Sequence, residues 1–240
     1  MLLDTFLRVC PKCNEKFQRT ELMSYSFFGN SEVWSDGHND SLYAAEAMTV
    51  PFARCPLCNQ LIWIEDAKVV HDRIPENLNA IPRMDYPSGE LAQNPQETLR
   101  KDALRLLDDT KLSAERQLSL HLLIWRNIND DYRKFRNLLR AFSLREALKT
   151  RRHAMALKNT KRKCMTQALN LINEIQNSDK PLFDEQEELM LKIELLRESG
   201  HFSQAKKLLS TAGTKLNSYP DFVKKTQKAL LFRTKKVFRI

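Results

Sequence analysis

The sequence twice carries nearly the same five residues, Cys10-Pro11-Lys12-Cys13-Asn14 and Cys55-Pro56-Leu57-Cys58-Asn59. Two thiolates separated by two residues can bind one ion only where the backbone curls around it. Proline after the first cysteine presets φ for such a turn. Asparagine after the second cysteine tolerates the left-handed conformation that the turn often needs. The two segments therefore predict two matching metal-binding turns.

Together the turns supply four thiolates, from Cys10, Cys13, Cys55 and Cys58. Four cysteines match the closed tetrahedral shell of structural zinc and leave no open position on the ion, so we expect one structural Zn²⁺ per chain rather than a catalytic one. A thioredoxin-like redox pair would need one such motif in a βαβ context, which is absent here. A zinc deaminase would need H-x-E with P-C-x-x-C, and the sequence has neither in that form.

Residues 14–54 separate the two cysteine pairs, which is more than a minimal zinc ribbon needs. This insertion is either a partner-binding loop or a third strand with a loop that covers a small core. We favour the second interpretation because long loops are only sometimes functional. We interpret His38 and His71 as surface histidines and Cys164 as a buried core thiol. The insertion includes Tyr25, Phe28, Trp34 and His38.

The charge is unevenly distributed along the chain. Residues 1–92 contain 8 Lys and Arg against 13 Asp and Glu, and the remaining residues contain 31 against 17, so the two parts carry −5 and +14. Within the second part, residues 133–163 hold 12 basic residues and one acid, and residues 222–240 hold 7 basic residues and no acid. Such an asymmetry indicates two modules with different roles.

The pattern of residues also changes near residue 92. Before it, short strand-like runs such as 6–9, 50–54, 17–28 and 61–64 flank the cysteine pairs, and a Pro-bearing segment at 74–89 resembles a linker arm. After it, helical periodicity prevails. We therefore expect an α+β protein with a β-rich zinc ribbon at 1–92 and an all-α domain at 93–240.

Five helices are expected before residue 200. The first begins at Pro95 after an Asn94 cap, and the second begins after Ser113. The third runs from about Asp130 into the basic stretch, the fourth covers about 161–176, and the fifth follows a break at 178–181 and ends near Ser199. A final amphipathic segment covers 221–240.

The segment from Leu189 to Leu209 contains one helix, a turn at Gly200 and a second helix. It resembles a tetratricopeptide (TPR) repeat, with Gly200 at the turn, Phe202 as the following aromatic residue and Ala205 as the small residue of the second helix. Ile193 departs from that pattern, where the family prefers Gly or Ala. The ribbon followed by TPR-like helices is similar to a loose group of bacterial proteins, and the resemblance implies binding of a peptide or protein partner but no activity.

The basic stretches have two interpretations. They either contact the phosphates of a nucleic acid, or form the solvated face of a bundle and a capping helix. For residues 221–240 the contacted surface could also be a membrane, and there we favour the capping helix. The candidate phosphate-contacting residues are Arg151, Arg152, Lys161, Arg162, Lys163, Lys224, Lys228 and Lys235.

The sequence lacks a Gly-rich phosphate loop, a nucleophile elbow, an H-E-x-x-H helix and paired catalytic carboxylates. We therefore expect a non-enzymatic adaptor that engages a protein partner, with a nucleic-acid-binding accessory protein as the alternative. No apolar stretch is long enough for a membrane span. Four of the five cysteines lie in two C-x-x-C pairs, which fit a metal site in a reducing compartment better than a disulfide framework. Together with the lack of room for a signal peptide before Cys10, they lead us to expect a cytoplasmic protein. The oligomeric state stays open.

Overall fold

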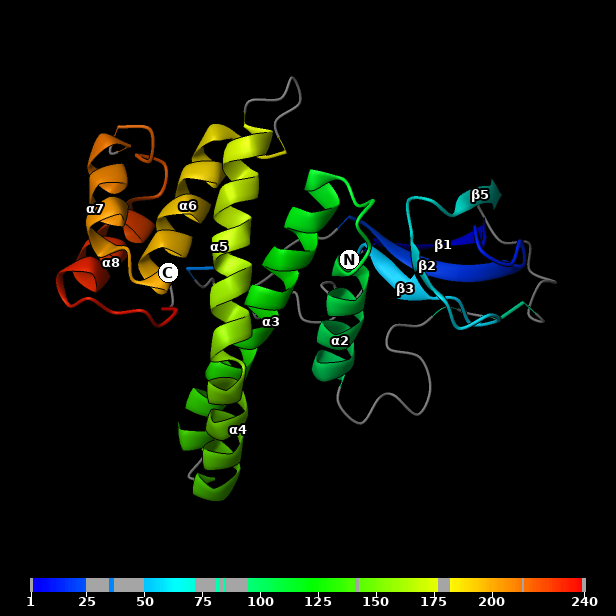
Figure 1. The fold of residues 1–240 in the computed structure, drawn as a ribbon, viewed down its shortest axis with the longest axis horizontal. Helices are drawn as coiled ribbons and strands as arrows, with labels where there is room; N and C mark the ends of the chain where they lie inside the picture. The colour runs from blue at the N-terminus through cyan, green and yellow to red at the C-terminus, as the bar shows by residue number, and fades with distance from the viewer. Residues whose placement is uncertain are drawn as a thin grey trace. The chain divides into compact units, whose positions relative to one another are not determined.

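The computed structural model describes residues 2–24, 35–36, 50–71, 81–82, 84, 95–140, 143–176, 182–212 and 214–238 (Figure 1). The chain forms two compact units, one from residues 1–32 and 39–102 and the other from residues 33–38 and 103–240. This division lies ten residues after the boundary expected at residue 92, inside a helix. It also assigns Ser35 and Asp36, from between the cysteine pairs, to the helical unit.

The first unit contains a three-stranded antiparallel sheet in the order β2-β1-β5 and a separate two-stranded hairpin of β3 and β4. The strands are β1 (Leu2–Val9), β2 (Lys16–Ser24), β3 (Phe52–Arg54), β4 (Leu61–Trp63) and β5 (Lys68–His71). Each cysteine pair therefore lies in the connection between two antiparallel strands, as the sequence predicts. The expected strand over 17–28 is described as far as Ser24.

The core of this unit is small and surrounds the cysteines. Phe17 and Phe52 are fully buried, and Ile62 is 1% exposed. Phe17 and Ile62 belong to the same apolar cluster as the sulfur atoms of Cys10 and Cys55. A core of this size gives little hydrophobic stabilisation by itself, which is the usual setting for a structural metal.

The described residues contain seven helices, most of them in the second unit. They are α2 (Pro95–Leu107), α3 (Ala114–Arg140), α4 (Leu144–Ala156), α5 (Lys158–Ile175), α6 (Glu185–Ser199), α7 (Phe202–Thr211) and α8 (Pro220–Leu231). None of these helices is long and apolar enough to cross a membrane. The α+β class is confirmed.

Three helix boundaries differ from the sequence expectation. The second and third predicted helices form one continuous helix, α3, because the polar Asn127–Asp131 stretch that resembles a loop is helical, with Asn127, Asn129 and Asp131 buried. The basic stretch 133–163 is divided among the end of α3, the whole of α4 and the start of α5. The final segment, expected to be amphipathic over 221–240, is helical only to Leu231, so Val237 lies outside the helix.

Helix α6 lies between two apolar clusters of the helical unit. Leu195 packs with Trp125 of α3 and Ile172 of α5. On its other side, Ile193 packs with Ala205 of α7 and with Phe222 and Leu230 of α8. Figure 1 shows α5, α6 and α7 as neighbouring helices. Apolar residues therefore lie on two separate sides of α6, which explains its weak amphipathicity.

The turn between α6 and α7 confirms the expectation for Gly200, whose φ is 94°. The His201 amide donates to the Leu196 carbonyl at 2.8 Å and the Gly200 amide to the Arg197 carbonyl at 3.1 Å. This pair of bonds is the Schellman termination of a helix, in which glycine adopts the left-handed conformation without strain. The helix–turn–helix arrangement follows directly from this residue.

Candidate functional site

The four predicted cysteines meet at one point of the first unit. Their ligand atoms all lie within 4.8 Å of one another, and this is the one such group of His, Cys, Asp or Glu among the described residues. The Sγ atoms of Cys10 and Cys58 are 3.9 Å apart, and those of Cys13 and Cys55 are 3.8 Å apart. All four are free thiols. Each close pair joins a cysteine of one turn to a cysteine of the other.

These separations fit a tetrahedral metal site. With metal–sulfur bonds of about 2.3 Å, the edges of a tetrahedron of thiolates are about 3.8 Å. A disulfide needs about 2.05 Å between the sulfur atoms, far less than is observed. The four cysteines can therefore hold one metal ion, and their soft tetrahedral shell is compatible with zinc.

The two turns have the same backbone hydrogen bonds. In the first, the Asn14 amide donates to the Cys10 carbonyl and the Cys10 amide to the Glu15 carbonyl, both at 2.9 Å. In the second, the amides of Asn59 and Cys55 form the equivalent bonds at the same distance. The φ angles of Asn14 and Asn59 are 61° and 56°, which confirms the left-handed conformation expected for both.

Neighbouring groups hold the second turn in place. Arg54, directly before Cys55, donates from Nη1 to the Asn59 carbonyl and from Nε to the carboxylate of Asp102, both at 3.0 Å. The Asp102 side chain is 3% exposed. A charge-assisted contact of this kind is stronger than a neutral hydrogen bond. It links the metal-binding turn to helix α2.

The thiols of the cysteines differ in pKa. Burial raises the pKa of Cys55 to about 12. Burial also raises that of Cys10, but backbone N–H groups outweigh it and the net shift is downward. Cys164 lies outside the site, is 2% exposed and has a pKa raised to about 11 by burial, as expected for an inert core thiol.

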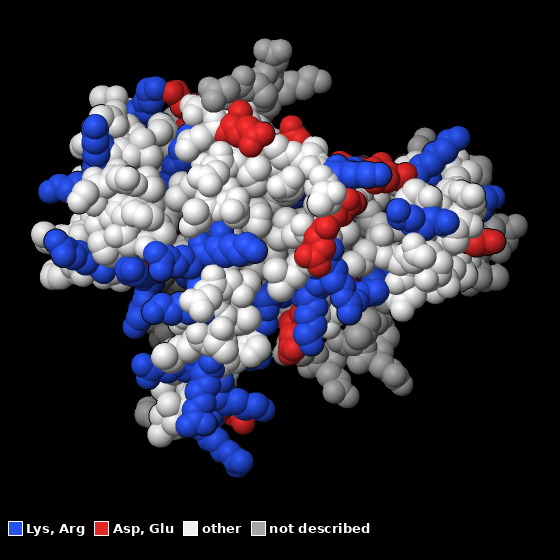
Figure 2. Space-filling model, in the orientation of Figure 1, with Lys and Arg blue, Asp and Glu red and all other residues white. Residues whose placement is uncertain are grey.

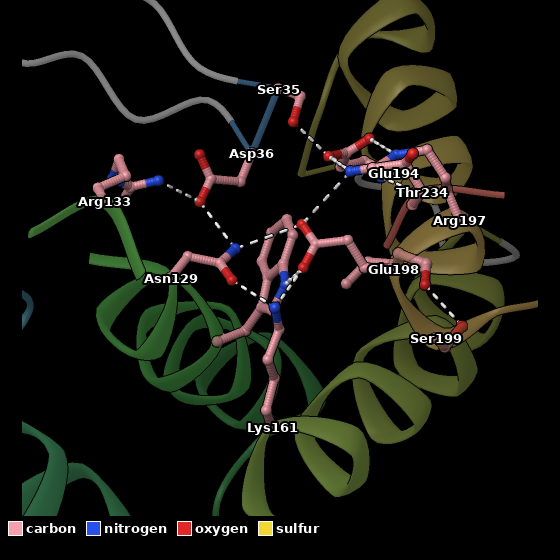
Figure 3. Close-up of polar contacts among 12 residues, drawn as sticks. Ser35, Asp36, Asn129, Arg133, Lys161, Glu194, Arg197, Glu198, Ser199 and Thr234 are labelled. Carbon is pink, nitrogen blue, oxygen red and sulfur yellow. Dashed lines mark hydrogen bonds and ion pairs between the residues drawn. The ribbon is translucent and has the colours of Figure 1, made fainter. Parts of the chain in front are cut away.

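A second cluster lies in the helical unit and consists of buried charges (Figure 3). Asp36 accepts from Arg133 Nη1 at 2.7 Å and from Asn129 Nδ2 at 2.8 Å. Burial opposes ionisation of Asp36, but the guanidinium of Arg133 outweighs it, so the pKa of Asp36 is lowered. The Asp36 side chain is fully buried and its charge is balanced by Arg133.

Glu198 is the neighbouring acid of this cluster. Its carboxylate lies 2.5 Å from Lys161 Nζ and accepts from Trp125 Nε1 and Asn129 Nδ2, both at 3.3 Å. Burial raises the pKa of Glu198 to about 7, although the ammonium of Lys161 acts in the opposite direction. Because its ammonium group contacts the buried Glu198, the side chain of Lys161 is directed into the protein, as Figure 3 shows.

The cluster also anchors the end of the chain. The Ser35 amide donates to the Phe238 carbonyl, and the Phe238 amide donates to the Ser35 hydroxyl oxygen. The Ser35 hydroxyl in turn donates to Glu194. Arg197 donates to Glu194 and to the Thr234 carbonyl. Its guanidinium carbon lies 5.0 Å from the Phe238 ring centroid. A part of the insertion and the C-terminal segment are thus both fixed to α6.

The predicted phosphate-contacting residues have different surroundings. Seven are exposed, whereas Lys161 is paired with Glu198. Figure 2 shows Lys and Arg gathered over α4 and the adjoining end of α5, with few acids among them. Lys235 Nζ lies 6.0 Å from the Phe202 ring centroid. The guanidinium carbon of Arg151 lies 6.0 Å from the Phe135 ring centroid. The exposed residues are Arg151, Arg152, Arg162, Lys163, Lys224, Lys228 and Lys235.

Sequence reasoning missed the buried polar cluster. Asp36 lies in a stretch that resembles a turn, and nothing local indicates a partner 97 residues away. A signal does exist in α6, where Glu194, Arg197 and Glu198 interrupt an otherwise apolar run at the spacing of one helix face. The insertion residues Tyr25, Phe28, Trp34 and His38, the 74–80 and 85–89 parts of the linker and the side chain of His71 lie outside the described part of the structure.

Comparison of the chain with protein-family models, curated proteins and solved structures found no match in any of the three.

Proposed function

We propose that the protein is a non-enzymatic adaptor with a zinc-ribbon module and a TPR-like helical module that engages a protein partner. Large apolar side chains on α4 carry this proposal. Leu144, Leu148 and Met155 are 62%, 43% and 57% exposed and lie on one face of the helix. Exposed apolar groups concentrated on a helix face commonly mark an interaction surface. The α6–α7 pair, with its turn at Gly200, supports the TPR-like assignment.

The zinc ion has a structural role in this proposal. The sulfur separations support a closed Cys₄ shell, and the small core around Cys10 and Cys55 supports a need for metal in folding. Cys13→Ser with Cys58→Ser removes two ligands and is expected to release about one zinc ion per chain. Cys164→Ser is the matched control and should retain it. Plasma mass spectrometry of the purified proteins measures the content, and iron in place of zinc would contradict the assignment.

Capture from a native lysate, with and without nuclease, tests the adaptor role. We expect a protein partner that remains after nuclease treatment and is lost with Leu144→Asp plus Leu148→Asp. The control, Leu231→Asp plus Phe232→Asp, alters two apolar residues that are 78% and 67% exposed after α8. Loss of all captured material on nuclease treatment would contradict the proposal.

The second candidate is a nucleic-acid-binding accessory protein. The exposed cations of α4, α5 and α8 favour it, because unpaired Lys and Arg release counterions from a phosphate backbone. Among the described residues, Arg152, Lys163, Lys224 and Lys228 form no ion pair. Their substitution by Gln would then weaken binding to an RNA oligonucleotide and reduce its dependence on salt.

A further inference from the structure

The helical unit contains a groove of about 1010 Å³. Its walls come from the C-terminal half of α3, the end of α4, the start of α5, the end of α6 and residues 235–237. Because one residue, Leu157, separates α4 from α5, the same side of the two helices borders the groove over Arg151, Met155, Lys158 and Arg162. The groove lies entirely within residues 103–240.

The inner surface of the groove is mainly apolar. Tyr132, Phe135 and Leu139 of α3 contribute at helical spacing. Met165 and Val237 lie deeper and are 3% and 7% exposed. Leu139 is 41% exposed although it lines an apolar surface. An apolar groove of this kind loses unfavourable contact with water when another apolar surface enters it.

The rim of the groove is cationic. Five exposed cations lie along it, and no ion pair is formed by any of them within the described residues: Arg151, Lys158, Arg162, Lys235 and Lys236. Glu198, the one acid that lines the groove among the residues that the structure describes, is buried and paired with Lys161. Any occupant therefore meets positive charge at the edges and apolar groups in the centre.

We propose that this groove binds an acidic amphipathic peptide segment of a protein partner, with its apolar side chains against the floor and its Asp or Glu side chains against the rim. The inference rests on the proposed adaptor function and specifies its binding site. An amphipathic helix placed in an apolar groove is a common mode of peptide recognition. Charge complementarity selects acidic flanks, because a basic peptide would meet unpaired like charges at the rim.

Nucleic acid fits the groove less well. Its phosphates would satisfy the rim, but the apolar floor would be left against water or against a charged backbone. Phosphate contacts also need no recess, and the equally exposed Lys224 and Lys228 of α8 would serve them. The combination of floor and rim is what favours a peptide.

Fluorescence anisotropy of the full chain with labelled synthetic peptides tests this binding site. The probe has about 15 residues, leucine at one helical face and glutamate at the flanks. The comparison peptides carry lysine at the flanks, or the same composition in scrambled order. Met155→Asp with Lys158→Glu alters floor and rim together at exposed positions, and Lys224→Glu with Lys228→Gln is the control with the same change in net charge.

We expect the acidic probe to bind the wild type and the α8 control with equal affinity. Its affinity for the groove variant should be lower by about tenfold or more. Equal binding of the lysine-flanked or scrambled peptide, or unchanged binding to the groove variant, would overturn the site. Displacement of the probe by single-stranded RNA, with RNA binding lost in the groove variant, would also overturn it. If a lysate partner resists nuclease but the peptide does not bind, the adaptor function stands and the groove proposal fails. If the peptide binds but no such partner is captured, the groove proposal stands and the adaptor function fails.

Discussion

Arg133 Nη1 lies 2.7 Å from Asp36 Oδ2, although 97 residues separate them in the chain. Both side chains are almost completely buried, at 5% and 0% exposed. Asn129 completes the hydrogen bonding of the carboxylate. The pair fixes a part of the segment between the two cysteine pairs inside the helical unit. Removal of Asp36 leaves the buried Arg133 with Asp130 as its ion-pair partner.

Asp36→Asn is therefore expected to destabilise the helical unit by about 3 kcal/mol. The amide keeps the shape of the carboxylate but leaves the Arg133 charge without its main partner. Urea unfolding followed by far-ultraviolet circular dichroism measures the change, because most helices lie in this unit. Asp221→Asn, at an exposed first turn of α8, is the control and should change stability by less than about 0.5 kcal/mol.

A double-mutant cycle with Arg133→Met separates the pair from its surroundings. If the two residues act together, the double variant is less destabilised than the sum of the single variants, by roughly 1–3 kcal/mol. Strict additivity would contradict a direct energetic contact between Asp36 and Arg133.

This ion pair also shows what the sequence alone cannot reveal. Asp36 lies beside glycine and asparagine, a composition typical of a turn, and its partner is determined by tertiary packing. The same reason explains why α3 was divided in the sequence expectation. Asn127, Asn129 and Asp131 disfavour a helix locally, but buried contacts override that preference. The predicted amphipathic segment 221–240 likewise runs past the end of α8, because periodicity does not reveal where a helix ends.

The metal-binding turns could be predicted because their geometry is local. Proline, the cysteine spacing and the final asparagine each restrict the same few dihedral angles. The turn at Gly200 is local in the same sense. The groove required α3, α4, α5 and the C-terminal segment to come together, and no single stretch of sequence encodes that.

The left-handed conformation of Asn14 and Asn59 leads to a prediction about metal affinity. Valine at either position should lower the affinity about tenfold, since a β-branched residue at positive φ costs about 1–2 kcal/mol. Glycine should keep or increase the affinity, because both side chains are exposed and glycine adopts this conformation freely. Competition with a chromophoric zinc chelator measures both. Equal loss with glycine and valine would show that the side chain, and not φ, matters.

Thr226 of α8 is fully buried, and its hydroxyl has no hydrogen-bond partner among the described residues. Thr226→Val replaces the hydroxyl by a methyl group of similar size. The variant should be more stable by about 1 kcal/mol, because the unpaired polar group is removed from the core. Thr211→Val is the control, since the exposed Thr211 hydroxyl donates to backbone carbonyls of α7. A loss of stability in Thr226→Val would indicate a bonded hydroxyl.

His121 of α3 leads to a prediction about pH. It is 7% exposed, and its Nδ1 has no hydrogen-bond partner among the described residues. Burial, together with the charge of Lys163, lowers its pKa from 6.5 to about 4. Because the folded-state pKa lies below the unfolded value, the stability contributed by neutral His121 is complete above pH 6.5 and is lost as pH falls towards 4.

His121→Leu removes this titration at a site where the ring nitrogen makes no bond. Between pH 6.5 and 4, the free energy of unfolding of the variant should fall less steeply than that of the wild type. The difference in slope corresponds to the uptake of up to about one proton on unfolding. His201→Leu, which alters an exposed histidine, is the control. Urea unfolding at half-unit pH intervals measures the three profiles. Identical slopes for His121→Leu and the wild type would mean that the pKa of His121 is the same in the folded and unfolded states, and that burial does not lower it.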